Sequence, residues 1–233
     1  MRVSVILFPG SNCDHDAEYV YRKLLGQEVQ LVWHREHDLR SPDLVVLPGG
    51  FAYGDYLRTG ALARVSPVMQ EIRKFASRGG PVLGICNGFQ ILCESGLLPG
   101  ALLQNIGMRF LSQFVHIKIE NAGTVFTRGC AQGSVITCPV AHFEGNYFAD
   151  EQTLERLEGE GRVVFRYCDR DGRVDAADRV LNPNGAAHAI AGIANEFGNV
   201  VGLMPHPERA VEDIIGGVGR NSGLPMFAGS LSN

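Results

Sequence analysis

Short runs of almost purely apolar residues constrain the fold of this chain more than any other feature. They lie in the first part of the sequence, at Val3–Phe8, Val29–Trp33, Leu44–Leu47 and Val82–Ile85. A strand with one face in water alternates apolar and polar side chains, whereas a strand covered on both faces is apolar throughout. Apolar residues at helical spacing fill Asp14–Leu25 and Ala61–Phe75, and Gly79-Gly80 ends the second segment. This order of elements predicts an α/β fold with a doubly wound, mostly parallel sheet.

The second half of the chain has a different pattern, in which strand-like runs are separated mainly by turn-forming residues. The runs are Phe114–Ile119, Ser134–Val140, Val163–Tyr167, His188–Ile193 and Val200–Met204. Residues 182–185 and 195–199 have the Asn, Pro and Gly content of hairpin turns. We therefore expect added antiparallel strands that extend the sheet. The glycine-rich segment 216–219 is expected to be mobile, before a short final helix around 224–231.

Composition excludes several classes of protein. The 233 residues are 45% hydrophobic and carry 21 Lys and Arg against 25 Asp and Glu, with no basic run, which argues against nucleic-acid binding. No apolar run approaches the ~20 residues of a membrane span, and the N-terminus lacks the features of a signal peptide. No linker or internal repeat divides the chain, so we expect a single domain over residues 1–233.

The six cysteines are at positions 13, 86, 93, 130, 138 and 168. They lack the close spacing of a zinc site, and in a chain without an export signal they are expected to remain thiols in a reducing cytosol. Five are interpreted as small buried or half-buried side chains. Cys86 has a more specific context.

Cys86 lies between a buried strand and an amphipathic segment, in the pattern Gly84-Ile85-Cys86-Asn87-Gly88. Small residues two before and two after a nucleophile permit the strained strand-to-helix turn called a nucleophile elbow. The amides at the start of the helix would favour the thiolate, and that of Asn87 could receive an oxyanion. The alternative is an ordinary core cysteine between strand and helix.

A base for this nucleophile is available in Pro205-His206-Pro207-Glu208, directly after the run Val200–Met204. The prolines restrict the loop, and Glu208 could accept a hydrogen bond from the His206 imidazole and fix its tautomer. The alternative is that Glu208 merely opens a helix. Together with the elbow, the pattern favours a Cys86–His206–Glu208 triad.

A third motif, Pro48-Gly49-Gly50, ends the strand Leu44–Leu47. Glycine permits positive φ, so the backbone could direct amides outward, and in a parallel sheet this end would lie beside the elbow. Gly50 is therefore a candidate second oxyanion donor, with a simple turn as the alternative. His34 and His37, in a charged stretch, are expected to be solvated.

The three motifs resemble the signatures of class I (triad-type) glutamine amidotransferases, which have a flavodoxin-like core and hydrolyse glutamine to glutamate and ammonia. A narrower similarity, over nearly the whole chain, is to the amidotransferase subunits of phosphoribosylformylglycinamidine synthases of de novo purine biosynthesis. It rests on four segments: Phe8–Asp14, Gly49–Arg58, Cys86–Gln90 and Pro205–Arg209.

The resemblance implies roles for individual residues. Cys86 would attack the glutamine amide, and His206, oriented by Glu208, would protonate the leaving ammonia and then activate water. The amides of Gly50 and Asn87 would hold the oxyanion. Gln90 would help to hold the amino-acid end of the substrate. His142 would lie in a substrate-side loop, although it could also be an ordinary polar loop residue.

One position departs from the family pattern: Phe143 stands where the family usually has glycine. A side chain there could narrow the substrate pocket or point to solvent.

The sequence contains neither a P-loop nor a Gly-x-Gly-x-x-Gly between a strand and a helix, so no ATP site is recognisable. The resemblance therefore implies no cofactor in this chain, with ATP and Mg used by a large synthetase subunit that receives the ammonia. It also implies a small accessory subunit and a cytosolic complex. The Phe51–Arg58 loop is expected to form part of the contact, and ammonia to travel through an enclosed passage.

Three other interpretations remain open from the residues. A cysteine hydrolase or a glyoxalase-type enzyme shares the elbow, but Asn87 and the late His-Pro-Glu motif argue against both. A scaffold subunit without turnover would not need Cys86, His206 and Glu208. An amidotransferase that feeds a different synthetase is distinguished only by the Phe51–Arg58 loop and by Asn87 and Phe89.

Overall fold

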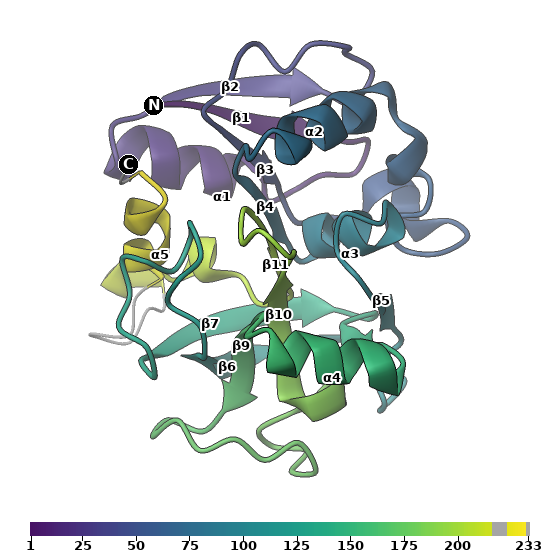
Figure 1. Cartoon of the computed structure of the whole chain (residues 1–233), viewed down its shortest axis with the longest axis vertical. Coiled ribbons are helices and arrows are strands. Elements are labelled where there is room, and N and C mark those ends of the chain that lie inside the picture. Colours follow the sequence, from purple (N-terminus) through teal and green to yellow (C-terminus); the bar gives the residue numbers. More distant parts are fainter. Residues whose placement is uncertain (216–222, 232–233) are drawn as a thin grey trace.

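The computed structural model describes residues 1–215 and 223–231. Its main feature is a nine-stranded sheet in the order β2-β1-β3-β4-β11-β10-β9-β6-β7 (Figure 1). The strands of this sheet are β1 (Arg2–Leu7), β2 (Glu28–Trp33), β3 (Leu44–Leu47), β4 (Val82–Ile85), β6 (Leu111–Ile119), β7 (Val135–His142), β9 (Val163–Cys168), β10 (Ile190–Ala194) and β11 (Val200–Leu203). A separate pair is formed by β5 (Ala101–Leu103) and β8 (Asn146–Phe148).

The α-helices are α1 (Asp14–Glu18), α2 (Pro67–Ser77), α3 (Asn87–Glu94), α4 (Glu151–Gly159) and α5 (Leu224–Gly229). A π-helical segment, Tyr19–Leu24, continues α1. Short 3₁₀ turns are found at Ala52–Asp55, Ala63–Val65, Ala187–Ala189, Pro207–Arg209 and Asp213–Ile215. In Figure 1, α1 and α5 lie on one side of the parallel strands, and α2 and α3 lie on the other.

Five neighbouring strands, β2, β1, β3, β4 and β11, pair in parallel. Their order is the flavodoxin-like one, with the N-terminal strand second and the order reversing beside it. Every residue of β3, β4 and β11 is buried, as expected for strands covered by helices on both faces. The fold class predicted from the apolar runs is confirmed.

The other four strands extend this sheet in antiparallel fashion. β11 joins the two parts, because it pairs in parallel with β4 and antiparallel with β10. The turn between β10 and β11 closes with the Asn195 N–H donating to Val200 O, and Gly198 has a φ of +70°. The sequence groups residues 200–204 with the added antiparallel strands; in the structure this strand pairs antiparallel with β10 and also completes the parallel layer.

Two boundaries differ from the prediction because of local backbone chemistry. The helix expected over Ala61–Phe75 begins at Pro67, since a residue before proline avoids helical ψ and Ser66 is extended at ψ 141°. The strand expected from His188 begins at Ile190, because His188 and Ala189 have left-handed φ values of 51° and 56°.

Helix α4 was not predicted, although its start has a clear signal. The Asp150 carboxylate accepts a hydrogen bond from the Thr153 N–H at 2.8 Å, which is an N-cap. That bond lowers the pKa of Asp150. Only Leu157 is buried on this helix, so its apolar periodicity is too weak to reveal it.

The final helix α5 lies where it was expected, with Pro225 in its first turn. The prediction for segment 216–219 lies outside the described residues, and the extent of the domain, 1–233, stays a prediction. No helix among residues 1–215 and 223–231 is long and apolar enough to cross a membrane.

Gly88 lies at a close contact between α3 and β3. A Cβ on Gly88 would lie 2.0 Å from Leu47 O, a backbone atom that cannot move away freely. Overpacking of this kind costs about 1–3 kcal/mol or more, so Gly88→Ala should lower the free energy of unfolding by at least that amount in urea titration.

The matched control is Gly159→Ala, at the end of α4, where a new Cβ meets nothing within 4 Å. This variant should be as stable as the wild type or slightly more so, because alanine is the better helix former. Equal stability of both variants would contradict the close contact.

Candidate active site

The carboxyl ends of three parallel strands bring the chemically important loops together. β3, β4 and β11 are neighbours in register, so their last residues lie side by side. The chain leaves these strands into Gly49-Gly50, Cys86 and Pro205-His206 respectively. Open α/β sheets bind their ligands at this edge.

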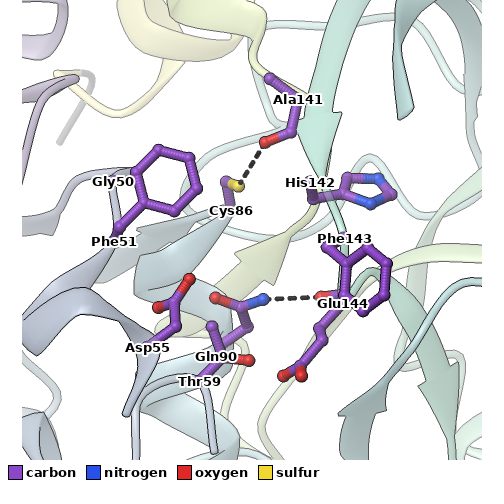
Figure 2. Close-up of a pocket in the computed structure, with 10 residues that line it drawn as sticks. All are labelled: Gly50, Phe51, Asp55, Thr59, Cys86, Gln90, Ala141, His142, Phe143 and Glu144. Atoms are coloured by element: carbon purple, nitrogen blue, oxygen red, sulfur yellow. Dashed lines mark hydrogen bonds between the residues drawn. The ribbon is translucent and has the colours of Figure 1, made fainter. Parts of the chain in front are cut away.

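Cys86 occupies a strained turn between β4 and α3. Its φ and ψ are 51° and −105°, which a non-glycine residue adopts only when its surroundings hold it there. The side chain is 4% exposed, and its Sγ donates to Ala141 O at 3.8 Å (Figure 2). The turn thus presents the sulfur at the end of the sheet, as the elbow pattern predicted.

The glycines of the elbow motif permit this turn. A Cβ on Gly84 would lie 2.5 Å from Leu92 Cδ1, and one on Gly88 would meet Leu47 O. α3 can therefore approach β3 and β4 closely only because both positions lack a side chain.

His206 and Glu208 form a buried pair at the end of β11. Nδ1 of His206 and Oε1 of Glu208 are 2.6 Å apart, and the two residues are 1% and 2% exposed. The His206 N–H donates to Pro139 O at 2.8 Å, which fixes the loop against β7. The carboxylate can therefore hold the tautomer that leaves Nε2 available.

The electrostatics of this pair favour a charged imidazole. Burial, the largest influence, works against it, but the Glu208 carboxylate and then the thiols of Cys86 and Cys13 raise the pKa of His206 well above its usual value. Nε2 of His206 has no hydrogen-bond partner among the described residues. The protonated Nε2 is therefore available to give its proton to a bound group.

Gly49 shows how closely these groups approach one another. A Cβ at Gly49 would lie 2.6 Å from Cε1 of His206, 3.0 Å from Sγ of Cys13 and 3.4 Å from Cβ of Cys86. The three side chains therefore surround one backbone position, which must be glycine.

Gly50 and Asn87 are placed to supply backbone amides. Gly50 pairs with Ser11 in an isolated antiparallel bridge, whose hydrogen bonds run from the Asn12 N–H to Gly49 O and from the Phe51 N–H to Gly10 O. In such a pair the Gly50 N–H points away from residues 10–12. Asn87 is the first residue of α3, where backbone amides lack partners within the helix.

A cavity of about 90 Å³ opens beside the sulfur. Figure 2 shows the residues that line it, which are Gly50, Phe51, Asp55, Thr59, Cys86, Gln90, Ala141, His142, Phe143 and Glu144. These ten residues include two carboxylates and no lysine or arginine. Side-chain oxygens of Asp55, Thr59 and Glu144 are buried without a hydrogen-bond partner.

A chain of hydrogen bonds connects the walls of this cavity. The Ala52 N–H donates to Asn87 Oδ1, Asn87 Nδ2 donates to Gln90 Oε1, and Gln90 Nε2 donates to Glu144 O, at 3.1, 2.9 and 2.6 Å. Gln90 is thus in the cavity as expected, but its carboxamide also ties α3 to the loop after β7.

His142 and Phe143 form the wall opposite the elbow (Figure 2). His142 is 3% exposed, its Nδ1 lies 3.1 Å from Asn105 Oδ1, and burial lowers its pKa to about 3, so the imidazole is neutral. Phe143 is also among the residues that line the cavity.

The structure brings together all seven residues singled out in the sequence: Gly50, Cys86, Asn87, Gln90, His142, His206 and Glu208. Sequence analysis missed Asp55, Thr59 and Glu144, whose only signal was their presence in motif loops. It also missed the position of Cys13, which is buried as expected but lies beside His206.

Cys13, His206 and Glu208 also form a possible metal-ligand group among the described residues, with ligand-type atoms within 4.8 Å of one another. The His206–Glu208 hydrogen bond already occupies one nitrogen and one oxygen of this group. A metal bound to the remaining imidazole nitrogen would remove the base from the site.

The expectation that His34 is solvated was wrong. His34 is 3% exposed, and its Nδ1 lies 2.8 Å from the Tyr53 hydroxyl and 3.1 Å from Ser66 Oγ. Burial lowers its pKa. It follows β2 directly, so it lies under the loop between β3 and α2 despite its charged neighbours in sequence.

This fold, with a nucleophile elbow and a buried His–Glu pair at one edge of the sheet, defines a triad-type glutamine amidotransferase domain. The family described as "CobB/CobQ-like glutamine amidotransferase domain" matches residues 1–221. The chain is 55% identical over 230 residues to the phosphoribosylformylglycinamidine synthase subunit PurQ of Bradyrhizobium diazoefficiens, covering 98% of this chain and 96% of that protein. It is 54% identical to the subunit of the same name from Salinibacter ruber, covering 93% and 91%. The chain therefore belongs to the PurQ family of glutamine amidotransferases.

Solved structures agree with this assignment. A chain of PurLQS from Thermotoga maritima superposes with a TM-score of 0.83 and 42% identity, covering 99% of this chain and 97% of that one. A glutamine amidotransferase from the same organism, at 18% identity and a TM-score of 0.57, shares the fold. The resemblance inferred from the sequence motifs is confirmed, whereas the roles of individual site residues stay predictions.

Substitution of Glu208 tests the electrostatics of the pair. Without its carboxylate, burial is left to disfavour the imidazolium, so Glu208→Gln should lower the pKa of His206. The titration can be followed by NMR on protein with labelled histidine. Glu212→Gln, which removes a nearby carboxylate bonded to Tyr19, is the control and should leave the His206 titration in place. An unchanged titration in Glu208→Gln would contradict the assigned cause.

Proposed function

We propose that this chain is the glutaminase subunit of a phosphoribosylformylglycinamidine synthase. It hydrolyses L-glutamine to glutamate and ammonia and passes the ammonia to a synthetase that converts formylglycinamide ribonucleotide to formylglycinamidine ribonucleotide in purine biosynthesis. The observation that carries the proposal is the convergence of Cys86, with its strained backbone, and the buried His206–Glu208 pair beside a cavity. Membership of the PurQ family supports the substrate and the pathway.

The geometry supports a two-step reaction. The Cys86 thiol gives its proton to His206 as Sγ attacks the side-chain carbonyl carbon of glutamine, and the amides of Gly50 and Asn87 hold the oxyanion. The C–N bond breaks as His206 gives its proton to the leaving nitrogen, which leaves as ammonia and a glutamyl thioester. His206 then takes a proton from water, the water oxygen bonds to the carbon, and the C–S bond breaks to release glutamate.

Asp55 and Glu144 explain how the amino-acid end of glutamine is recognised. Both line the cavity, each has a buried oxygen without a partner, and no basic side chain is present in the lining to pair with them. An α-ammonium group between them would satisfy these acceptors. The buried Thr59 hydroxyl is a further partner for the polar end of the substrate.

The chain supplies no ATP site in this proposal. A large synthetase subunit uses ATP and Mg, and a small accessory subunit completes the complex, which is cytoplasmic. The match to a chain of PurLQS supports such an assembly. The exposed Tyr56 and Leu57, in the loop that borders the cavity, are suited to a contact with the large subunit.

The direct test is glutamate release from glutamine, measured with the chain alone and with the synthetase and accessory subunits, ATP and formylglycinamide ribonucleotide. Strong stimulation in the full mixture is expected. No glutamate in either mixture, with the protein folded, would overturn the proposal.

Cys86→Ala separates catalysis from structure. Loss of the nucleophile should reduce glutamine-dependent synthesis by about a thousandfold or more, because no thioester forms. Synthesis from added ammonium salts should persist, because the synthetase is intact. Loss of both activities would mean that Cys86 supports the complex structurally.

The raised pKa of Asp55 leads us to expect that substrate binding depends on pH. Burial, and then the charge of Glu144, raises the pKa of Asp55 to about 6. The carboxylate is therefore negative above that pH and becomes neutral below it, so KM for glutamine should rise as the pH falls from 7 to 5. Asp55→Asn should have a high KM throughout that range.

The control for this effect is Asp171→Asn, which neutralises an exposed acid in the loop after β9. It should retain the wild-type pH profile of KM. A profile for Asp55→Asn that matches the wild type would contradict the role of Asp55.

A further inference from the structure

A second, smaller cavity lies against Cys86 on the side of His206. Its volume is about 30 Å³, and its walls include Asn12, Cys13, His206 and Arg209. It shares Gly50, Phe51, Cys86 and Ala141 with the larger cavity, so the two adjoin at the nucleophile, whereas Asn12, Cys13, His206 and Arg209 line only the smaller one. Asn12 is exposed, so the cavity extends from the buried imidazole toward the surface.

The size of this cavity restricts what can enter it. A cavity needs roughly 10–15 Å³ of this kind of volume for each water molecule. The smaller cavity therefore has room for about two molecules of the size of water or ammonia, and no room for an amino acid.

Cys13 has a fixed place in the wall of this cavity. Its Sγ donates to Asn12 Oδ1 at 3.0 Å and accepts from Arg209 Nη2 at 3.1 Å. Arg209 Nε in turn donates to Asp16 Oδ2 at 2.9 Å. Burial raises the pKa of Cys13, so it remains a neutral thiol next to His206.

The side chain of His206 is the proton-exchanging group in the wall of the smaller cavity. Its Nε2 is buried without a hydrogen-bond partner, and His206 lines the smaller cavity, not the larger one. The leaving nitrogen and the attacking water are each bonded to the carbon that Cys86 holds, and each exchanges a proton with Nε2 of His206. Such a group must therefore reach both Cys86 and His206. The smaller cavity is lined by both residues.

We propose that the smaller cavity is the chamber through which ammonia leaves and the hydrolytic water enters, and that Cys13 is the positioning residue that sets its size. This proposal rests on the glutaminase function. Once the thioester has formed, the glutamyl chain fills the larger cavity, so water needs a second way to the carbonyl carbon. Ammonia released at His206 vacates the position that this water then takes.

The bonds and protons of both reaction steps balance among glutamine, water, Cys86 and His206. In the first, the S–H bond of Cys86 breaks and its proton passes to His206, the S–C bond forms, the C–N bond breaks, and the nitrogen takes its third proton from His206. In the second, the water oxygen bonds to the carbon, one proton passes to His206, and the C–S bond breaks. The sulfur then takes that proton, which restores the starting state.

Cys13→Leu tests the proposal by filling the chamber from a wall that does not line the larger cavity. The variant is assayed in the complex with the synthetase subunits, ATP and formylglycinamide ribonucleotide. Breakdown of the thioester should become rate-limiting, so kcat for glutamine should fall by about tenfold or more, in line with the sensitivity of such steps to small displacements. The apparent KM should fall with it, and mass spectrometry of the intact chain should detect the accumulated glutamyl adduct.

Matched variants separate this effect from general damage. Cys13→Ser keeps the volume of the chamber and should restore thioester breakdown relative to Cys13→Leu. Cys130→Leu makes the same change at a half-buried cysteine outside both cavities and should accumulate no adduct. If Cys13→Leu does not fold, the smaller Cys13→Val carries the same expectation.

The outcomes distinguish this proposal from the proposed function. An active wild type whose Cys13→Leu variant keeps its kcat, or loses kcat/KM without an adduct, overturns the chamber alone. A wild type that forms no glutamate overturns the glutaminase function and the chamber together.

Discussion

The close contact of α3 with β3 is the constraint on which the rest of the site depends. With no side chain at Gly88, the helix backbone lies directly against the carbonyl of Leu47, and Gly84 allows the same approach from β4. This contact forces the chain at Cys86 into its left-handed conformation, since strand and helix must meet within one residue. The strained conformation aims the sulfur, and the aligned strands on either side supply the other groups.

Burial then determines the charges of these groups. The His206–Glu208 pair is almost fully enclosed, so its members interact strongly and the imidazole is charged more readily than in water. His142, equally buried but without a carboxylate, is kept neutral. Two histidines at one edge of a sheet thus have opposite charge states because only one of them has an acidic partner.

The sequence was sufficient to predict four of the five parallel strands and the motif loops at their carboxyl ends, because apolar runs and glycine motifs are local signals. Elements with weak local signals were missed: α4 has one buried residue, and the two-stranded pair has strands of three residues. His34 was misjudged because the loop that buries it, at Tyr53 and Ser66, is distant in sequence. Cys13 and the acidic pair, Asp55 and Glu144, were missed for the same reason. The role of these three residues depends on which loops lie together in the fold, and a single sequence does not show which loops do so.

The hydrogen bonds from Ala52 through Asn87 and Gln90 to Glu144 have a mechanical consequence. They join a loop with exposed apolar residues, the helix behind the nucleophile and the opposite wall of the cavity into one connected unit. Tyr53, Asp55 and Leu57 in that loop have positive φ, so its conformation is held by contacts and not by intrinsic preference. A force applied to the outer face of the loop is therefore transmitted to both walls of the cavity. The width of the cavity is therefore coupled to the conformation of the loop. A partner that binds the outer face of the loop also changes how tightly the cavity holds its ligand.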